Sequence, residues 1–468
     1  MKNAFLDWLD SQQGRQYELH ERYVNPAFVK TIRTIGFDKN FVRGQGEWLF
    51  DPEGNRYLDL LTGWGVFALG RNHPRVRSIL EQVLSRDMPN LVRMDCSLLA
   101  GLVAEKLTHH ANAESAANLS RVFFCNSGTE SVEGAIKFAR CFTRKPKILF
   151  CDHAFHGLTV GSLSLNGSDF FRERFGDLMP GTEKIPFNDL GALEEALRAK
   201  DVAAFVVEPV QGKTCDVVAD GYLAEAGRLC HKAGALLVVD EVQCGLGRTG
   251  KWFAFQHWPD AEPDIVCVAK ALSGGYVPVG AVVTSPRIMD SVFDGMERCV
   301  VHSNTFGQND LAMAAALATL QVMEEDELPS RAARLGEKTI ARLKEIGETC
   351  PFVYEVRGKG MMFGIDFRRP TGSLKLRAAW DALHLLNEGV FSQTVIVPLM
   401  HEHRILTQVA GYHTELIKFL PPINIGEEAL DYFVAAMRQV LDGLQRVPGS
   451  AWETVRVLAK GAATQIAR

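Results

Sequence analysis

DIVCVAKALSGG, residues 264–275, is the stretch that indicates the class of fold. Five apolar residues, 265–269, precede a single lysine, Lys270, and small residues with a glycine pair follow it. A short and continuous apolar run is typical of a strand buried on both faces of a parallel sheet. Lys270 would then lie at the carboxyl end of that strand, where open α/β sheets bind their ligands.

Similar apolar runs recur through the middle of the chain and alternate with helical patterns such as SVEGAIKFARCF. The runs are RVFFCNS, KILFCDH, AAFVVEP, ALLVVDEV and VGAVVTS. Strands that alternate with helices predict an α/β fold whose mostly parallel sheet is covered by helices on both faces. We expect a large domain over residues 76–325, an N-terminal segment over 1–75, and a C-terminal part over 326–468 that ends in a basic tail helix.

The composition and the charge exclude several classes of protein. The 468 residues are 47% hydrophobic and carry a net charge of -5 without a long basic block, which argues against a nucleic-acid partner. No apolar run approaches the roughly 18 residues of a membrane span, and the N-terminus lacks the apolar region of a secretory signal. The ten cysteines are scattered without a C-x-x-C pair, so we expect free thiols in a cytoplasmic protein and no metal site.

The residues that directly follow the apolar runs should meet at one edge of the sheet. These segments are CNSGTES, DHAFHG, EPVQGK, DEVQCG and KALSGG. In the first of them, Ser127, Gly128 and Thr129 open a helix, whose free backbone N–H groups and hydroxyls suit a phosphate. A plain N-cap with a capping box is the alternative interpretation.

Two charged residues at these strand ends also allow two interpretations each. Asp240 ends the run ALLVVD, so its carboxylate must be paired or hydrogen-bonded. It forms a structural ion pair or cap, or it is the partner of a protonated ring nitrogen in a pyridoxal-phosphate enzyme. Lys270 either extends to the surface or is a Schiff-base lysine whose pKa is lowered by burial. Together with a phosphate loop at the same edge, the two residues favour the cofactor.

A competing motif, GLGRTG at residues 245–250, matches the dinucleotide-binding pattern G-x-G-x-x-G. That pattern requires a helix directly after the glycines. The segment that follows here, KWFAFQHWPDAEPD, has two prolines and no helical period. We therefore interpret these glycines as a loop near the active site and exclude a nicotinamide cofactor.

The stretch VVDEVQCGLGRTG, followed by DIVCVAKALSGGYVPVGAVV, resembles the class III (ornithine/ω-) aminotransferases of pyridoxal-phosphate fold type I. NSGTESVEGAIKFAR, AFHG, VEPVQG and HSNTFGQNDLA occur in the order expected for that family, between about residues 45 and 425. The resemblance implies a large domain with a seven-stranded, mostly parallel sheet and a smaller α+β domain built from both termini. It also implies the cofactor pyridoxal 5'-phosphate and two ping-pong half-reactions.

The same resemblance implies a role for each matched residue. Lys270 would form the Schiff base and move a proton, and Asp240 would pair with the pyridine N–H. The other cofactor contacts would be Ser127, Gly128 and Thr129 at the phosphate, Phe155 and Val242 on the ring faces, Gln243 at the 3-oxygen, and Glu208 and His156 nearby.

Two of these implied roles carry qualifications. His156 would either contact the cofactor or have only a structural role, because a buried histidine is often a packed hydrogen-bonding group. Thr305 would reach the phosphate of a neighbouring subunit, which implies a homodimer or larger assembly with shared active sites.

Two departures from the family pattern leave the substrate open. In the ornithine and 4-aminobutyrate branches, VEPIQG is followed by an acid that gates an arginine in an RFAPP-type motif. Here those positions are Lys213, in VEPVQGKTC, and Lys418, in LIKFLPP. Because lysine cannot form the bidentate fork of arginine, we expect dicarboxylate recognition to be weakened or rebuilt. Lys418 would bind a keto-acid carboxylate singly or, alternatively, face solvent.

Aromatic residues near the expected entrance favour a hydrophobic substrate. TGWGVFALGRNHP supplies Trp64 and Phe67, and Tyr276 and His302 are further candidates. An aromatic, apolar lining suits a hydrophobic amine or aldehyde, and HSNTFGQNDLA is similar to aminotransferases that act on lipophilic aldehydes. The alternative is that these aromatic side chains belong to the core.

Three classes of function compete for this sequence. The leading hypothesis is a transaminase that moves an amino group between an amine or ω-amino compound and a keto acid or aldehyde. An aminomutase on the same fold, which rearranges one molecule without an added acceptor, is the alternative. A non-catalytic binding module is disfavoured because Lys270, Asp240 and the phosphate loop are intact.

Overall fold

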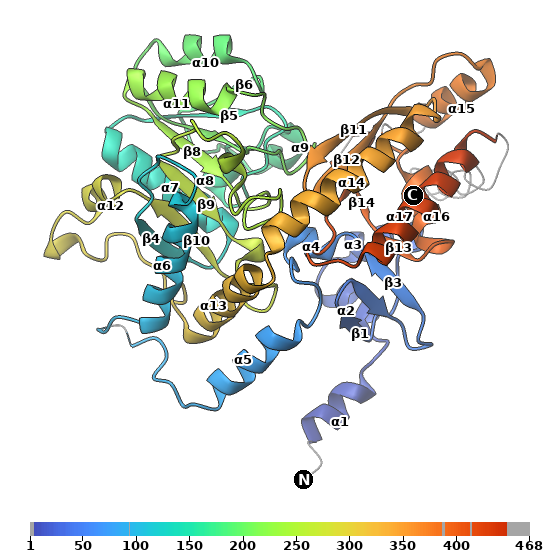
Figure 1. Cartoon of the computed structure of the whole chain (residues 1–468), viewed down its shortest axis with the longest axis horizontal. Helices are drawn as coiled ribbons and strands as arrows, with labels where there is room; N and C mark the ends of the chain where they lie inside the picture. The colour runs from blue at the N-terminus through green and yellow to red at the C-terminus, as the bar shows by residue number, and fades with distance from the viewer. Residues whose placement is uncertain (1–3, 93, 386–388, 412–413, 447–468) are drawn as a thin grey trace.

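The computed structural model describes residues 4–92, 94–385, 389–411 and 414–446 of the chain. Figure 1 shows a large α/β part and a smaller part that is built from both the blue N-terminal and the orange and red C-terminal segments. The expected basic tail helix falls in 447–468, outside the described residues. The domain boundaries at 75/76 and 325/326 stay a prediction.

The large part is organised around one sheet of seven strands, and it confirms the expected α/β fold. In spatial order these strands are β4 (Arg121–Cys125), β10 (Gly280–Thr284), β9 (Ile265–Val268), β8 (Leu236–Asp240), β7 (Val202–Val207), β5 (Lys147–Cys151) and β6 (Thr182–Ile185). Strand β10 is antiparallel to both of its neighbours, and the other adjacent pairs are parallel. All six apolar runs of the sequence form strands of this sheet.

The central strands are buried on both faces because helices cover the sheet from two sides. In β8, Leu237 and Val239 belong to one apolar cluster with helix α11 (Tyr222–Ala233). Val238, which points the opposite way, packs in a second cluster with helix α7 (Gly128–Thr143). This double burial explains why the sequence of β8 is a continuous apolar run and not an alternating one.

The smaller part contains two sheets of four strands each. The first joins β1 (Arg43–Gln45), β2 (Trp48–Phe50), β3 (Arg56–Asp59) and β13 (Ile405–Leu406), and the second joins β11 (Val353–Lys359), β12 (Met362–Phe367), β15 (Leu416–Phe419) and β14 (Gln408–Val409). Strand β13 pairs in parallel with β3, so strands from the two ends of the chain share one sheet. Helices α14 (Leu328–Glu348), α16 (Gln393–His401) and α17 (Glu427–Leu444) pack on this part.

The remaining helices connect these sheets or lie on the surface. They are α1 (Ala4–Ser11), α2 (Gln16–Tyr23), α3 (Pro26–Thr34), α4 (Thr62–Gly65), α5 (Pro74–Leu84), α6 (Leu98–Asn112), α8 (Val160–Leu163), α9 (Asp169–Arg172), α10 (Leu190–Leu197), α12 (Pro286–Val292), α13 (Asp310–Glu325) and α15 (Leu374–His384), with 3₁₀ turns η1 (Ala254–His257), η2 (Lys270–Ser273) and η3 (Met296–Arg298). Within the described ranges, no helix combines the length and the apolar character needed to cross a membrane.

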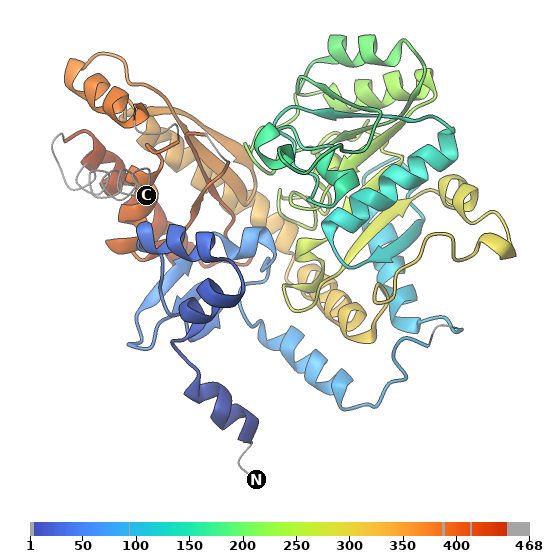
Figure 2. The ribbon, with the colours of Figure 1, turned by 180° about the vertical axis from the view of Figure 1, so that it is seen from behind.

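The carboxyl ends of the parallel strands face the smaller part of the molecule. Figure 2, seen from behind, shows the two parts meeting along one side of the large sheet. Loop residues after β5, β7, β8 and β9 line a shared cavity with residues of β14 and β15. This arrangement places the candidate site between the two parts.

Candidate active site

The cavity between the two parts has a volume of about 740 Å³. It brings together residues that lie far apart in the sequence, from Trp64 to Lys418. The candidate residues among its lining are Trp64, Ser127, Gly128, Thr129, Phe155, His156, Glu208, Lys213, Asp240, Val242, Gln243, Lys270, Tyr276 and Lys418. Three candidates, Phe67, His302 and Thr305, do not line it.

Lys270 lies directly beyond strand β9, at the first position of the turn η2. Its backbone φ is 39°, in the left-handed region that costs a non-glycine residue on the order of 1–3 kcal/mol. Such strain persists where the surrounding structure fixes a side chain for function. Within the described parts of the chain, no group accepts a hydrogen bond from its ammonium group and no carboxylate pairs with it.

The environment of Lys270 favours its neutral form. Burial lowers the pKa of its amine, although the carboxylates of Asp240 and Glu208 oppose this shift. A neutral amine can attack a carbonyl carbon or accept a proton. The position of Lys270 and the lowering of its pKa suit a nucleophile or a base.

Asp240 ends strand β8 and forms a buried pair with His156. The Nδ1 of His156 donates to Oδ2 of Asp240 at 2.7 Å, and the backbone N–H of Val242 donates to Oδ1 at 3.0 Å. Burial alone would lower the pKa of His156, but its bond to Asp240 and the nearby negative charge outweigh burial and raise that pKa. Because a carboxylate oxygen accepts more than one hydrogen bond, Asp240 can still receive a ring N–H.

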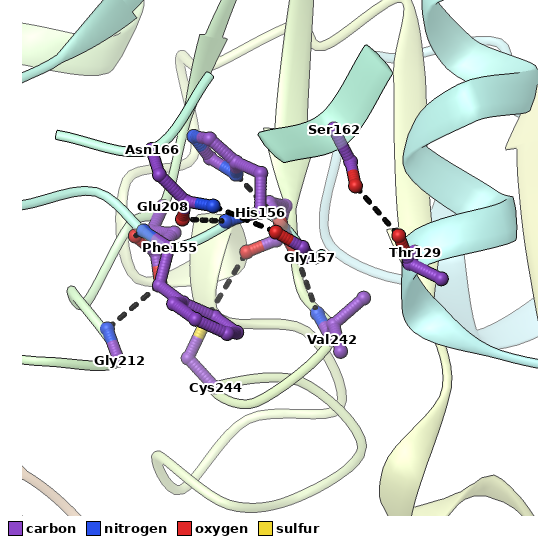
Figure 3. A network of polar contacts seen from close by, with 11 residues as sticks. Thr129, Phe155, His156, Gly157, Ser162, Asn166, Glu208, Gly212, Val242 and Cys244 are labelled. Atoms are coloured by element: carbon purple, nitrogen blue, oxygen red, sulfur yellow. Dashed lines mark hydrogen bonds and ion pairs between the residues drawn. The ribbon is translucent and has the colours of Figure 1, made fainter. Parts of the chain in front are cut away.

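Glu208 is held by two backbone donors. Its Oε2 accepts from the N–H of Phe155 at 3.0 Å, and its Oε1 accepts from the N–H of Gly212 at 2.7 Å, as Figure 3 shows. Burial raises the pKa of Glu208 in spite of these bonds. The carboxylate thereby joins the segment after β5 to the segment after β7 on one side of the cavity.

The expected phosphate loop lies at the start of helix α7. Ser127 is the N-cap, and its hydroxyl accepts from the N–H of Glu130 at 3.3 Å. The hydroxyl of Thr129 contacts that of Ser162 at 2.6 Å (Figure 3). No described residue accepts from the backbone N–H groups of Gly128 and Thr129. The cap interpretation and the phosphate interpretation are therefore compatible, because the cap leaves two donors for an anion.

A glycine on the neighbouring strand allows the phosphate loop its position. A Cβ atom at Gly280 would lie 2.5 Å from the carbonyl oxygen of Ser127, which is a backbone atom and cannot rotate away. We expect Gly280→Ala to weaken cofactor binding about tenfold or more and to lower the melting temperature, since it displaces the loop. Fluorescence titration of the apoprotein with pyridoxal phosphate measures the first effect.

Helix α17 offers a matched control for this substitution. A Cβ at Gly443 would meet no atom within 4 Å, so Gly443→Ala should stabilise the helix by about 0.5–1 kcal/mol. Cofactor affinity should be unchanged in this variant. Equal affinity of the Gly280→Ala variant and the wild type would show that Gly280 does not position the loop.

The two lysines that depart from the family pattern differ sharply in this structure. Lys418, on strand β15, is only 3% exposed, which excludes the solvent-facing alternative. Its ammonium donates to the carbonyl oxygen of Gly212 and to Oε1 of Gln243, the latter at 3.0 Å, and burial lowers its pKa to about 8. Lys213 instead lies 4.6 Å from the ring centroids of both Phe155 and Phe171.

The aromatic candidates also differ in whether they line the cavity. Trp64 lies at the cavity, where its Nε1 donates to Oε1 of Gln408 at 2.7 Å, and Tyr276 is a further lining residue. Phe67 packs under the guanidinium of Arg71 at 3.8 Å, away from the lining.

The two candidates from HSNTFG lie outside this cavity as well. His302 contacts Nζ of Lys137 at 2.7 Å. Thr305 is exposed on the loop that precedes α13.

Several lining residues carry no signal in the sequence. Phe171 lies in GSDFFRERFG and follows no apolar run, yet it packs edge-on against Phe155 with centroids 5.4 Å apart. Gln408 and Val409 belong to a strand of two residues. Phe171 lies in the short helix α9, and its sequence neighbours do not mark it as a lining residue.

This fold and this site together define a class of enzyme. A partly buried lysine that has no polar partner among the described residues, an acid at the next strand end and free N–H groups at a helix start match the reactive carbonyl, the ring nitrogen and the phosphate of pyridoxal phosphate. The residues present therefore fit that cofactor, and they are those of a pyridoxal-phosphate enzyme with an α/β large domain.

The chain belongs to the class-III aminotransferases. The model of the family described as "Aminotransferase class-III" matches residues 35–441. This membership confirms the resemblance inferred from the motifs, as well as the cofactor, pyridoxal phosphate, that the family uses. It does not favour the alternative of an aminomutase.

Characterised relatives support the same family. The chain is 32% identical to aminotransferase PigE of Serratia sp. (strain ATCC 39006) over 94% of its own length and 55% of PigE, so it spans about half of that protein. It is 42% identical to acetylornithine aminotransferase of Methanopyrus kandleri, over 70% of this chain and 81% of that protein.

Solved structures share the fold as well. The ornithine aminotransferase of Toxoplasma gondii superposes with a TM-score of 0.80 at 28% identity, over 95% of this chain and 99% of the other. A pyridoxal-phosphate-bound amine transaminase from an uncultivated Pseudomonas species gives 0.73 at 26% identity, over 87% and 96% of the two chains.

Proposed function

We propose that this protein is a transaminase that moves an amino group from an amine or ω-amino compound to a keto acid or aldehyde. The observation that carries the proposal is Lys270, whose amine meets no acceptor or carboxylate among the described residues and lines a cavity shared with Asp240 and the start of helix α7. Pyridoxal phosphate, when bound, supplies the electron sink that acidifies a hydrogen on the substrate carbon. The protein must then orient the substrate and move that proton.

Each residue of the site has a part in this reaction. Lys270 would hold the cofactor covalently. In its neutral form, the amine of Lys270 would remove the proton from the substrate carbon and then donate this proton to a second carbon atom. Asp240 would keep the ring nitrogen protonated, with His156 orienting the carboxylate through its 2.7 Å bond. The other cofactor contacts would be Ser127, Gly128 and Thr129 at the phosphate, Phe155 and Val242 at the ring, and Gln243 and Glu208 at its edge.

The apolar lining supports a hydrophobic substrate for one of the two half-reactions. Trp64, Phe171 and Tyr276 line the cavity together with aliphatic residues such as Val409. Apolar walls with few polar groups favour ligands that bury a hydrocarbon chain. We therefore include lipophilic amines and aldehydes in the proposed substrate range.

A homodimer with shared active sites is part of the proposal. Thr305 is exposed and does not line the cavity of its own chain. It would instead contact the phosphate in the site of a second subunit. Sedimentation should give at least a dimer, and Thr305→Ala should weaken cofactor binding without changing the sedimentation of that dimer.

Half-reaction spectra test the proposed reaction. A donor amine alone should change the absorption spectrum of the cofactor in the holoenzyme, and an added keto acid or aldehyde should restore it. Diamines, alanine, glutamate and long-chain amines form the informative panel. Turnover of an amine without any added acceptor would contradict the proposal and favour an intramolecular rearrangement.

The pH dependence of cofactor attachment should report the lowered pKa of Lys270. Only the neutral amine reacts with an aldehyde, and burial makes that form available below the ordinary pKa of 10.5. The rate constant for attachment of pyridoxal phosphate to the apoprotein should therefore rise with pH to a plateau, with its midpoint below that of Nα-acetyl-lysine. An equal or higher midpoint would contradict this account.

A further inference from the structure

The amine of Lys213 lies in the active-site cavity without an anionic partner among the described residues. Its Nζ lies 4.6 Å from the ring centroids of both Phe155 and Phe171, and it contacts these two rings. Among the described residues, no carboxylate pairs with it and no atom accepts a hydrogen bond from it. Lys213 lines the same cavity as Lys270.

The aromatic contacts account for only part of the energetics of this group. A cation near aromatic rings is stabilised by them, but rings leave the three N–H donors of the ammonium group without a strong acceptor. Burial lowers the pKa of Lys213, which reflects this cost of partial desolvation. An anionic group that entered the cavity would supply the missing acceptor.

Glu208, the acid whose charge acts on Lys213, does not serve as that acceptor in this structure. Both oxygens of Glu208 accept from backbone N–H groups, those of Phe155 and Gly212. The charge of Glu208 raises the pKa of Lys213, yet no ion pair forms between them. The charge of Lys213 therefore remains available to a ligand.

Lys418, the third lysine of the cavity besides Lys213 and Lys270, already has acceptors for its ammonium group. Lys418 uses its ammonium group to hold the carbonyl of Gly212 and the amide of Gln243. These two bonds leave one N–H donor of Lys418, whereas all three donors of Lys213 lack an acceptor among the described residues. Lys418 is therefore a positioning residue in this structure.

The loop that carries Lys213 is fixed on both sides of this residue. On one side, Lys418 binds the carbonyl oxygen of Gly212. On the other side, Arg357 of strand β11 donates to the carbonyl oxygen of Thr214 at 2.9 Å and contacts the carboxylate of Asp216 at 2.8 Å. This support reduces the entropy that the loop would otherwise lose when it binds a ligand.

We propose that Lys213 binds the carboxylate of the keto-acid acceptor, and of the amino acid that it becomes. The inference rests on the proposed function and deepens it, because it assigns the carboxylate-bearing half-reaction to one residue. Amines and aldehydes that lack a carboxylate use the same cavity through its apolar walls. Lys213 thus contacts the substrates that carry a carboxylate, and the substrates without one bind in the same site independently of it.

The test compares Lys213→Met with the wild type in single half-reactions of the holoenzyme, monitored by cofactor absorbance. The donor half-reaction uses hexylamine, and the acceptor half-reaction uses pyruvate, 2-oxoglutarate or hexanal. A hydrogen bond to a charged group is worth about 1.5–3 kcal/mol, so the variant should need about 10- to 150-fold more keto acid for half-maximal rate. Hexylamine and hexanal should change by less than about threefold.

Two further variants complete the design. Lys213→Arg keeps the charge and should recover most of the keto-acid affinity. Lys359→Met is the matched control, because Lys359 also lies near an aromatic ring, that of Trp258 at 5.8 Å, but does not line the cavity. It should leave all four half-reactions unchanged.

A binding measurement separates this inference from the proposed function. Glutarate and propionate, which cannot react, should perturb the cofactor spectrum of the wild type and lose affinity about 10- to 150-fold in Lys213→Met. Equal affinity in both proteins, or equal losses for keto acids and hexanal, would overturn the role of Lys213. Failure of the wild type to react with any amine would instead overturn the proposed transamination, while the acid titration would still decide the role of Lys213.

Discussion

The Lys270→Ala variant is expected to lose at least about 10³-fold in kcat, because it would lack the residue proposed as both nucleophile and base. It should still bind pyridoxal phosphate, since the start of helix α7 and Asp240 do not depend on Lys270. Steady-state kinetics measure the loss, and dialysis should remove the cofactor more readily than from the wild type. The strained φ of 39° at this position remains in the variant, because alanine also carries a Cβ atom.

A surface lysine provides the control for this variant. Lys251 pairs with Glu114 at 2.6 Å, outside the cavity, and Lys251→Ala should retain wild-type kcat. Added methylamine should restore part of the activity of Lys270→Ala, because it can replace the missing base. Turnover of Lys270→Ala near the wild-type rate would refute the role given to this residue.

The Asp240→Asn variant is expected to lose about 10²- to 10³-fold in kcat, the range seen when one aligned polar group is removed from a buried active site. The amide can keep the bond from the N–H of Val242 through Oδ1, but it cannot stabilise a positive ring nitrogen. It also cannot accept from Nδ1 of His156 through its NH₂ group. The loss should therefore appear in kcat more than in the affinity for the cofactor.

A buried aspartate elsewhere controls for the general cost of removing such a charge. Asp51 is 8% exposed and accepts hydrogen bonds from Asn55 and Tyr57, outside the cavity. Asp51→Asn should lower the melting temperature and leave kcat within about threefold of the wild type. If Asp240→Asn and Asp51→Asn had the same kcat, Asp240 would have no electronic role.

The sequence predicted the centre of the large sheet well, because continuous apolar runs report burial on both faces. It did not indicate β6 (Thr182–Ile185), an edge strand with only one fully buried residue. It also did not indicate that β10 runs antiparallel to its neighbours, since an apolar run carries no information on direction. Both features depend on neighbours in space.

The candidate site was predictable where chemistry follows a strand. Asp240 and Lys270 were found because each ends an apolar run, and the cavity brings them together. Their catalytic roles stay predictions. The partners of Lys418 were not predictable, because Gly212 lies 206 residues away in the chain. The orientation of Phe171 toward Lys213 is likewise a product of the folded structure.

The central claim is that Lys270 holds pyridoxal phosphate at the end of strand β9. Reduction of the holoenzyme with borohydride, followed by proteolysis and mass spectrometry, tests it directly. The account predicts one modified peptide, with the mass of the reduced cofactor on Lys270 and none on Lys213 or Lys418. Modification of a different lysine, or of no lysine in a holoenzyme with full cofactor content, would contradict the account.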